Sequence, residues 1–400
     1  MLIRLANSPR HYDWGSTSAI SDLLGTKPSG RPEAELWFGT HGASPTWLVD
    51  HDEGYATLNE FVFANPSETV GSQDSVPFLL KVLAAGQPLS LQVHPSDEQA
   101  REGFARENAA GMHLTDPQRN YRDNQAKPEL IVSMCDEFVA LSGFREFSQT
   151  VALLRDVAQR SDSDHLARFV DDFEKRGDHS VTDSFTWALT YLLSDSAEVQ
   201  QLVAEMVAAC STLGEESNEL VGTVRELAEL YPSDPGIMVA TLLNRVVLGR
   251  SEALYLPAGN LHAYLRGIGI EIMRASDNVL RGGLTSKHID IAELTRVVDA
   301  SELREPRMRP MSKAGCLDTY APKSSGFVLH HYRGASDSDN VPVALPAAGC
   351  AIALCTSGPV TVTTASSTRV LARGEALFIT VDESNVSLHG SGELFVATAG

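Results

Sequence analysis

The sequence lacks the features that mark membrane proteins and disulfide scaffolds. No run approaches the roughly 18 apolar residues that span a bilayer, and the opening stretch MLIRLANSPRHYDWG has no apolar core of signal-peptide length. The five cysteines include no CxxC pair and are odd in number, which favours a reduced cytoplasmic protein over a disulfide framework. We therefore expect a cytoplasmic protein with no membrane partner.

Positive charge is also scarce. The chain has 32 Lys and Arg residues against 52 Asp and Glu, a formal net charge of -20 at pH 7. This balance argues against a broad basic face that binds nucleic acid, so a small anionic ligand would need a few locally placed cations. With 400 residues, 43% of them hydrophobic, the chain is globular and long enough for about two or three structural units.

Apolar residues are patterned differently in successive parts of the chain. Strand-length runs separated by Gly, Pro and Asp fill roughly the first 145 residues and indicate an all-β unit. Between about 147 and 249 apolar residues recur at helical spacing, and this stretch includes Ile237 to Val247 after a Pro-Gly pair. Strand texture then returns, and beyond about Ala321 short strands at near-regular spacing indicate a sandwich or barrel. The sequence thus predicts helices inserted between two stretches of β-structure.

Four residues form a candidate metal site. Gln92 and His94, in LQVHPSDEQA, share a face because side chains two residues apart on a strand point the same way. Alone, such a histidine is more often ordinary structure than a ligand. Glu129 opens a strand in QAKPELIV, and His262 follows an expected tight hairpin bend in LPAGNLHAYL. This nitrogen and oxygen set suits a borderline divalent ion, first of all zinc, and the absence of cysteine ligands favours an open catalytic position.

Charged residues accompany these segments. Lys81 interrupts the apolar run PFLLKVLAA, where a solvated lysine is least expected, so we interpret it as a buried or cleft lysine. The stretch from 271 to 287 combines carboxylates with cations, which together can move protons and hold an oxyanion. A surface salt-bridge cluster is the alternative interpretation. The candidates in and beside these segments are Lys127, Glu271, Asp277, Arg281 and Lys287, with weaker ones at Trp14 and Glu35.

Several long motifs occur in the order in which the type I mannose-6-phosphate isomerase family has them. They are YDWGS, AELWFGTH, FLLKVLAAGQPLSLQVHPSDEQA, NYRDNQAKPEL, LPAGNLHAYLRGIGIEIMRASDNVLRGGLTSKHID and RGEALFI. Because of them the chain resembles this family over essentially its whole length. The resemblance implies a zinc enzyme of the cupin class that interconverts mannose 6-phosphate and fructose 6-phosphate.

The resemblance also implies a fold and a domain division. The fold is mainly β, with two cupin-type jelly-roll β-barrels and an inserted α-helical domain. The implied domains are a catalytic cupin domain (1–146 plus 250–320), a helical insertion (147–249) and a C-terminal cupin-like domain (321–400). One zinc ion per chain is expected, because His330, His331 and His389 form no ligand cluster of the same kind in the sequence. We expect a monomer whose partner is a small sugar phosphate.

Residue roles follow from the resemblance position by position. It implies that Gln92, His94, Glu129 and His262 bind zinc, that Arg281 is catalytic, and that Lys81, Ser90 and Lys287 contact the phosphate. Trp14, Glu35, Lys127, Tyr264, Glu271 and Asp277 are implied to line the same pocket. One position departs from the family, which usually has His immediately before its Lys-Pro-Glu motif where this chain has Ala126. Lys127 or a carboxylate would have to cover any acid/base role of that histidine.

The chemistry of an aldose–ketose isomerisation fits these residues. The sugar ring opens, a proton is removed next to a carbonyl, and it returns to the neighbouring carbon through an enediolate. Glu271 or Asp277 is the expected proton carrier and Arg281 the group that stabilises the oxyanion. Two alternatives stay open at this point: a metal-dependent cupin oxygenase, and a non-catalytic sugar-phosphate-binding cupin, to which only Ala126 points.

Overall fold

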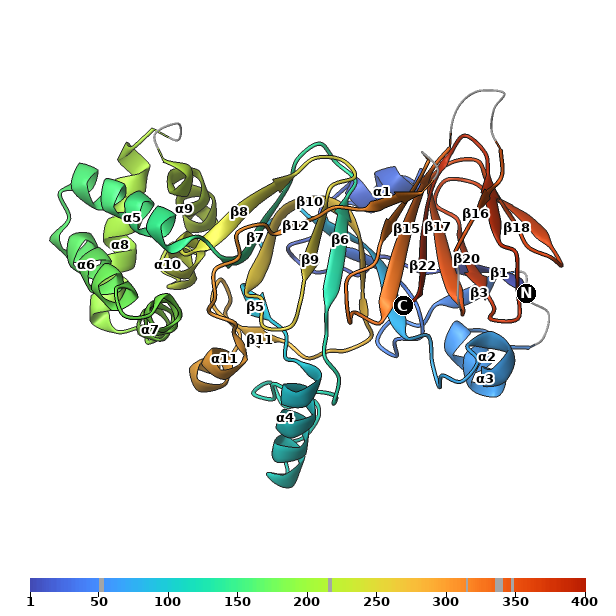
Figure 1. Ribbon diagram of the computed structural model, residues 1–400, viewed down its shortest axis with the longest axis horizontal. Coiled ribbons are helices and arrows are strands. Elements are labelled where there is room, and N and C mark those ends of the chain that lie inside the picture. The colour runs from blue at the N-terminus through green and yellow to red at the C-terminus, as the bar shows by residue number, and fades with distance from the viewer. Residues whose placement is uncertain (50–53, 215–217, 314–315, 335–340, 347–348) are drawn as a thin grey trace.

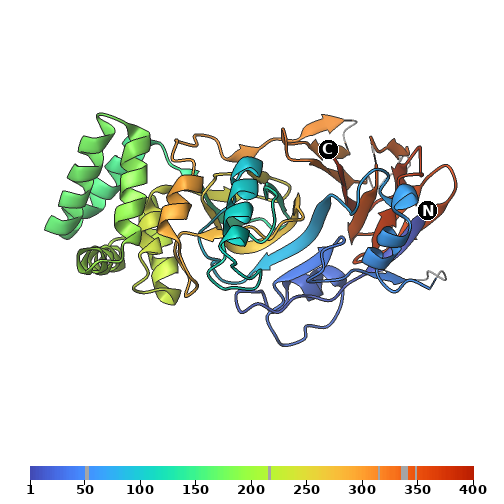
Figure 2. The ribbon, with the colours of Figure 1, turned by 90° about the horizontal axis from the view of Figure 1, so that it is seen from below.

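The computed structural model describes residues 1–49, 54–214, 218–313, 316–334, 341–346 and 349–400. The molecule is elongated, with helices at one end, the C-terminal strands at the other and a β-rich middle part between them (Figure 1). Figure 2 shows the same order of parts from below. The predicted mainly β fold with helices is confirmed at this level. None of the described helices is long and apolar enough to cross a bilayer, and the five cysteines are free.

The helical end starts directly after the strand that ends at Phe144. Serine side chains cap three of its helices, since Ser163, Ser180 and Ser196 each accept a hydrogen bond from a backbone N–H in the first turn. Together the helices bury a continuous apolar core against the middle part. The helices are α5 (Phe147–Ser161), α6 (Asp164–Gly177), α7 (Val181–Leu193), α8 (Ala197–Thr212), α9 (Glu219–Leu230) and α10 (Gly236–Thr241).

The predicted helix over Ile237 to Val247 is wrong in its second half. Helix α10 ends at Thr241, and Leu243–Leu248 forms strand β8, which pairs antiparallel with β7 (Phe138–Phe144). Apolar periodicity over so few residues does not separate helix from strand. The open edge of β7 decides for a strand, because its unpaired backbone groups gain a hydrogen-bonding partner.

The expected all-β character of the first 145 residues is also wrong in part. This stretch contains α1 (Ala19–Leu24), α2 (Leu58–Ala64), α3 (Pro66–Thr69) and the longer α4 (Asp97–Ala109). The signal for α4 is present in the sequence, because the motif SDEQ is a capping box. The Ser96 hydroxyl accepts from the Gln99 backbone N–H, and the Gln99 side chain accepts from the Ser96 backbone N–H.

The middle part is organised by one long strand, β10. It pairs with β4 and β6 along its second half and with β5 and β7 at its start. The strands carrying Lys81, Gln92 and Glu129 are therefore hydrogen-bonded neighbours of the strand carrying His262. The further strands of this part are β2 (Glu35–Phe38), β4 (Phe78–Ala85), β5 (Gln92–Val93), β6 (Glu129–Ser133), β9 (Ala253–Leu256), β10 (His262–Arg274), β11 (Leu280–Arg281) and β12 (Arg307–Met308).

The expected hairpin before His262 is not formed. Strand β6 lies between β9 and β10, so the two strands that flank the turn do not pair with each other. The turn nevertheless uses its glycine as predicted, since Gly259 has φ +82°. Its backbone N–H donates to the carbonyl of His94 at 2.9 Å, which ties the two histidine-bearing segments together.

The C-terminal strands form two further sheets, and the chain's first strand joins the larger one. Its order is β13-β14-β15-β22-β17-β20-β1-β3, and that of the smaller is β16-β21-β18-β19. The predicted domain boundaries stay a prediction, but strand pairing crosses them at β1 and β3. The strands are β1 (Leu2–Ala6), β3 (Trp47–Val49), β13 (Met311–Lys313), β14 (Leu317–Tyr320), β15 (Phe327–Arg333), β16 (Val343–Ala344), β17 (Ala351–Ser357), β18 (Val360–Thr363), β19 (Thr368–Leu371), β20 (Ala376–Ile379), β21 (Ser387–His389) and β22 (Glu393–Ala399).

Alternation along the middle strands separates a packing face from a polar face. On β4, Leu80 and Val82 join a core shared with the C-terminal sheet, and on β10 Ile270 and Ile272 do the same. The residues between them point to the opposite side of the sheet. Those residues include Lys81 and Glu271, which lie directly across from each other on the paired strands. A sheet covered on both faces reads as a nearly continuous apolar run with isolated charges, and this explains the sequence FLLKVLAA.

Two glycines in helices, one closely packed and one with open space beside it, give a matched test of how tightly α4 packs. Alanine at Gly103 in α4 would place a Cβ 2.3 Å from the Tyr121 ring, so Gly103→Ala should lower the free energy of unfolding by about 1–3 kcal/mol. In α9, Gly222 has nothing within 4 Å of that position, and Gly222→Ala should be neutral or stabilise by up to about 1 kcal/mol. Thermal unfolding measures both, and equal effects would contradict the expected clash.

A candidate metal centre in a polar pocket

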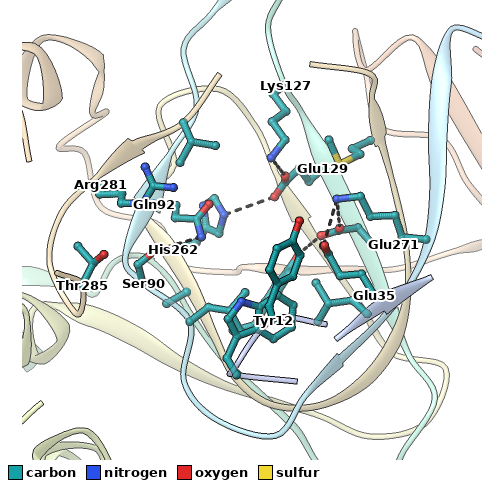
Figure 3. Close-up of a pocket in the computed structure, with 18 of the residues that line it drawn as sticks. Tyr12, Glu35, Ser90, Gln92, Lys127, Glu129, His262, Glu271, Arg281 and Thr285 are labelled. Carbon is teal, nitrogen blue, oxygen red and sulfur yellow. Dashed lines mark hydrogen bonds and ion pairs between the residues drawn. The ribbon is translucent and has the colours of Figure 1, made fainter. Parts of the chain in front are cut away.

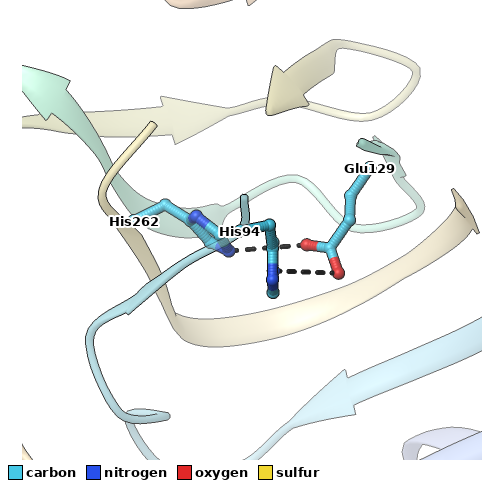
Figure 4. A group of neighbouring side chains, drawn as sticks. All are labelled: His94, Glu129 and His262. Atoms are coloured by element: carbon cyan, nitrogen blue, oxygen red, sulfur yellow. Dashed lines mark ion pairs between the residues drawn. The ribbon is translucent and has the colours of Figure 1, made fainter. Parts of the chain in front are cut away.

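Three buried side chains from separate segments meet in the middle part. One ligand atom from each of His94, Glu129 and His262 lies within 4.8 Å of the others, as Figure 4 shows. The Nε2 atom of His94 is 3.3 Å from Oε1 of Glu129, and Nε2 of His262 is 3.4 Å from Oε2. Each histidine therefore faces a different oxygen of one carboxylate.

Hydrogen bonds orient both imidazole rings for metal binding. Nδ1 of His94 is 2.7 Å from the backbone oxygen of Asn278, and Nδ1 of His262 is 2.9 Å from that of Asn260. A carbonyl only accepts, so each Nδ1 carries the hydrogen and each Nε2 presents a lone pair to the carboxylate. Nε2 of His94 is buried and has no hydrogen-bond partner. Lone pairs facing a carboxylate need a cation between them, and the three residues fit a divalent metal such as zinc.

Electrostatics keep the cluster in its metal-binding protonation state. Burial, reinforced by the ammonium of Lys127, lowers the pKa of His94 to about 4, so the ring is neutral at neutral pH. Burial alone would raise the pKa of Glu129. The charge of Lys127, whose Nζ is 2.9 Å from Oε1 of Glu129, outweighs it and the pKa falls well below the usual value. Glu129 is thus ionised, and His94 is neutral with a free electron pair on Nε2.

Gln92 lies on the strand next to this cluster, and a hydrogen bond to Ser90 holds its side chain. It pairs with His262 across β5 and β10 and with Arg281 across β5 and β11. Its amide Nε2 donates to Oγ of Ser90 at 3.3 Å, which leaves the side-chain oxygen for another partner. The predicted role of Gln92 as a fourth ligand stays a prediction.

The cluster forms part of the wall of a cavity of about 420 Å³ (Figure 3). Of the predicted site residues, all except His94 line it, and His94 lies behind the wall in contact with Glu129. The lining residues predicted from the sequence are Trp14, Glu35, Lys81, Ser90, Gln92, Lys127, Glu129, His262, Tyr264, Glu271, Asp277, Arg281 and Lys287.

One side of the cavity carries carboxylates around a buried lysine. The structure confirms that Lys81 is buried, with 5% of its surface exposed. Its Nζ lies 3.3 Å from Oε1 of Glu35 and 3.5 Å from Oε2 of Glu271. Burial opposes the charged form of Lys81, but the two carboxylates outweigh it and raise its pKa. The positive charge of Lys81 is therefore neutralised within the protein.

The carboxyl of Glu271 is a weaker acid than an ordinary glutamate. Burial, followed by repulsion from Glu129, raises the pKa of Glu271 to about 7. Its Oε1 accepts a hydrogen bond of 2.9 Å from the hydroxyl of Tyr264. Burial and the nearby Glu271 raise the pKa of that hydroxyl well above its usual value, so it stays a donor. A carboxyl that titrates near neutral pH can both take up and release a proton.

The other side of the cavity carries cations without carboxylate partners. Among the described residues, none forms an ion pair with Arg281 or Lys287. Burial lowers the pKa of each, and each is lowered further by other cations, Arg281 by Arg122 and Lys287 by Arg281 and Arg122. Figure 3 places Ser90, Arg281 and Thr285 on this side and Glu35 and Glu271 on the opposite side. A cluster of unpaired cations attracts an anion.

The candidate Asp277 and the departing position Ala126 have different surroundings from the other site residues. Asp277 lies at the exposed rim, with its side chain 52% exposed and Oδ2 3.3 Å from Nε2 of His41. The hydrogen bond to His41 lowers the pKa of Asp277. Ala126 is buried and does not line the cavity; its backbone N–H donates to Oδ1 of Asp97 at 3.0 Å.

Several cavity residues were not found by reasoning from the sequence. Tyr12 stacks on Trp14 with ring centroids 5.6 Å apart, and Trp37 lies two residues after Glu35 on the same face of β2. The Nε1–H of Trp37 is buried and has no hydrogen-bond partner, so it is a donor available to a ligand. Period-two alternation from Glu35 would have found Trp37, whereas Tyr12 and Trp14 lie outside any strand. Tyr231 comes from the helical end, and no sequence signal places it here.

The C-terminal histidines do not form a second metal group among the described residues. His331 instead lies 2.9 Å from Oε1 of Glu393 and stacks on Phe395. His330 contacts Thr319 at 3.0 Å. His389 is exposed.

Comparison with known proteins gives consistent matches. The family described as phosphomannose isomerase type I, catalytic domain, matches residues 2–147. The chain is 35% identical to mannose-6-phosphate isomerase of Escherichia coli over 98% of each chain. It is 29% identical to mannose-6-phosphate isomerase 1 of Arabidopsis thaliana over 100% of this chain and 94% of that one. A mannose 6-phosphate isomerase solved with zinc bound matches at TM-score 0.88 and 33% identity, over 100% of this chain and 99% of that one.

Loss of one ligand should empty the metal centre. His262→Ala removes a nitrogen donor from a set in which the remaining imidazole and carboxylate no longer surround the ion. We expect zinc affinity to fall at least about tenfold, measured by metal analysis after dialysis against a weak chelator. The exposed His389→Ala is the control and should retain zinc at the wild-type level, near one ion per chain. Full occupancy in the His262 variant would contradict the ligand assignment.

Proposed function

Because the chain belongs to the type I mannose-6-phosphate isomerase family, we propose that this pocket interconverts mannose 6-phosphate and fructose 6-phosphate with a bound zinc ion. The observation that supports this most directly is the pairing of a His94–Glu129–His262 centre with a cavity of divided charge. A sugar phosphate has one anionic end and a chain of hydroxyls. The cavity offers unpaired cations on one side and proton-carrying carboxylates on the other.

The metal is held by His94, Glu129 and His262, with Gln92 beside them as the proposed fourth ligand. Bound zinc supplies Lewis acidity that polarises or orients sugar oxygens. Lys127 keeps the carboxylate of Glu129 ionised through its contact of 2.9 Å. The backbone carbonyls of Asn278 and Asn260 keep Nε2 of both rings turned towards Glu129.

Glu271 is the better of the two predicted proton carriers. Its pKa of about 7 allows it to exist in both protonation states at neutral pH, whereas the pKa of Asp277 is lowered and its side chain lies at the exposed rim. In the proposed step, the Glu271 carboxylate removes the proton from the carbon next to the carbonyl and returns it to the carbonyl carbon, while the hydroxyl proton passes from one sugar oxygen to the other. The Tyr264 hydroxyl, which donates to Oε1, fixes the orientation of the carboxylate.

The phosphate is proposed to lie near Arg281, Lys287 and Ser90. The two cations have no carboxylate partner among the described residues, and the hydroxyl of Ser90 lies on the same side of the cavity. Arg281 adjoins Gln92 across β5 and β11, a position from which it can stabilise an oxyanion near the metal. The contacts do not favour a phosphate role for Lys81, since two carboxylates already balance its charge. Trp14 and Glu35 are proposed to line the sugar's binding site.

The finer architecture is also a proposal. The middle and C-terminal parts would be the two cupin-type jelly-roll barrels and α5 to α10 the helical insertion, with a single chain as the functional unit in the cytoplasm. The structural and sequence relatives favour the isomerase over a cupin oxygenase or a non-catalytic binding protein. Ala126 has no titratable group and does not line the cavity. Position 126 therefore supplies no acid or base in place of the family's usual histidine.

The deciding experiment measures fructose 6-phosphate formed from mannose 6-phosphate. We expect activity in the purified protein, loss of activity after chelation and recovery when zinc is added back. Ferrous iron with oxygen uptake would instead indicate an oxygenase. Binding of mannose 6-phosphate without any turnover in the zinc-loaded protein would indicate the non-catalytic alternative.

The pH dependence of turnover should report Glu271. The carboxyl must be deprotonated to accept a proton, and its pKa is raised, so the rate should fall as pH decreases through about 7. A bound cation favours the carboxylate and moves this limb towards lower pH. Glu271→Gln should reduce kcat by about 10²-fold or more and flatten this acidic limb. An unchanged limb in the variant would remove Glu271 from the step.

A further inference from the structure

The loop after β11 has a strained backbone. Residues 282–287 follow Arg281 and carry Thr285, Ser286 and Lys287 to the wall of the cavity. Within this loop Leu284 has φ +54°, a left-handed conformation that residues other than Gly, Asn and Asp rarely adopt. Such a conformation persists only where the surroundings hold it firmly, and strain of this kind gathers at functional sites.

One carboxylate from the helical end holds this loop. Oδ1 of Asp234 accepts the backbone N–H of Leu284 at 2.9 Å, and Oδ2 accepts that of Thr285 at 3.0 Å. Oδ1 also accepts the N–H of Gly236 at 2.7 Å, within its own turn. Both oxygens are therefore used for backbone hydrogen bonds, and Asp234 itself does not line the cavity.

The two segments fit closely at a pair of glycines. A Cβ added to Gly283 would lie 2.5 Å from Cα of Gly236. Neither position has room for a side chain, so the turn before α10 and the loop after β11 are packed backbone against backbone. The buried side chain of Leu284 enters the apolar core shared with the helices.

The same turn also contacts the other chain segment on this side of the cavity. The hydroxyl of Tyr231 donates to the carbonyl of Pro88 at 3.2 Å, two residues before Ser90. The backbone of Leu91 exchanges hydrogen bonds with Gly282 and Gly283, at 2.9 and 3.1 Å. The stretch from Tyr231 to Gly236 thus supports both segments that present the anion-binding candidates.

We propose that Asp234 is a positioning residue for the phosphate-binding side of the cavity. It acts through the backbone of Leu284 and Thr285, which sets the direction of Thr285, Ser286 and Lys287. The helical end then has a defined role in substrate binding, since it supplies the carboxylate that shapes this loop. The inference rests on the proposed function, because it takes the anion to be the phosphate of the substrate.

The test uses two variants of the zinc-loaded enzyme. Asp234→Ala removes all three hydrogen bonds. Asp234→Asn keeps one acceptor oxygen and places an amide N–H₂ opposite a backbone N–H. We expect the alanine variant to raise KM for mannose 6-phosphate about tenfold or more, with kcat within about threefold of wild type, because Asp234 contacts only the loop, while the metal centre and Glu271 keep their own contacts. The asparagine variant should lie between it and wild type. Inorganic phosphate, as a competitive inhibitor, should lose affinity by the same factor.

Ser180→Ala is the matched control. It removes an N-cap hydrogen bond of 3.2 Å at α7, and Ser180 does not line the cavity, so the variant destabilises the helical end and keeps the hydrogen bonds of Asp234. Its KM and phosphate inhibition should equal those of wild type. Asp234 variants with wild-type KM, or with kcat and zinc content reduced while KM is unchanged, would overturn the inference. A wild-type enzyme that does not isomerise mannose 6-phosphate would refute the proposed function; phosphate binding by calorimetry would then still test the loop.

Discussion

The buried carboxylate of Glu129 is the constraint around which the middle part is arranged. An ionised carboxylate with 4% of its surface exposed is strongly unfavourable unless charge and hydrogen-bonding partners surround it. Lys127 supplies the charge, and His94 and His262 face the two oxygens with their lone pairs. Because both ring Nδ1 atoms are committed to backbone carbonyls, the remaining space calls for a cation. A bound zinc ion therefore supplies the positive charge that this buried carboxylate and the two Nε2 lone pairs lack.

Charge around this centre is divided in a way that suits one kind of ligand. Lys81 is balanced by Glu35 and Glu271, while Arg281 and Lys287 form no ion pair within the part of the chain that the structure describes. Binding energy from a phosphate can hold the reacting carbons of a sugar beside the metal and Glu271 without itself taking part in the chemistry. The same division explains why an acidic protein with a net charge of -20 can bind an anionic substrate.

Much of this site could be predicted from local patterns, and the failures have definite causes. The interruption of an apolar run correctly marks Lys81 as buried. Strand alternation from Glu35 would also have indicated Trp37 on the same face of β2. Leu243–Leu248 forms a strand because the edge of β7 is open beside it, and no local pattern contains that information. The capping box before α4 is also a local signal, present in the sequence as SDEQ.

The sequence by itself determined which residues can share a face, where the long helical stretch lies, and that two histidines, a glutamate and a glutamine stand in strand-like segments. These properties depend only on neighbours within a few residues, so they can be predicted without knowledge of the tertiary structure. Only the tertiary structure decided that β10 lies beside four other strands, that β1 joins the C-terminal sheet, and that Asp234 reaches Leu284 across 50 residues. Strand pairing and backbone capping over such separations depend on the packing of the whole chain, which local periodicity does not encode.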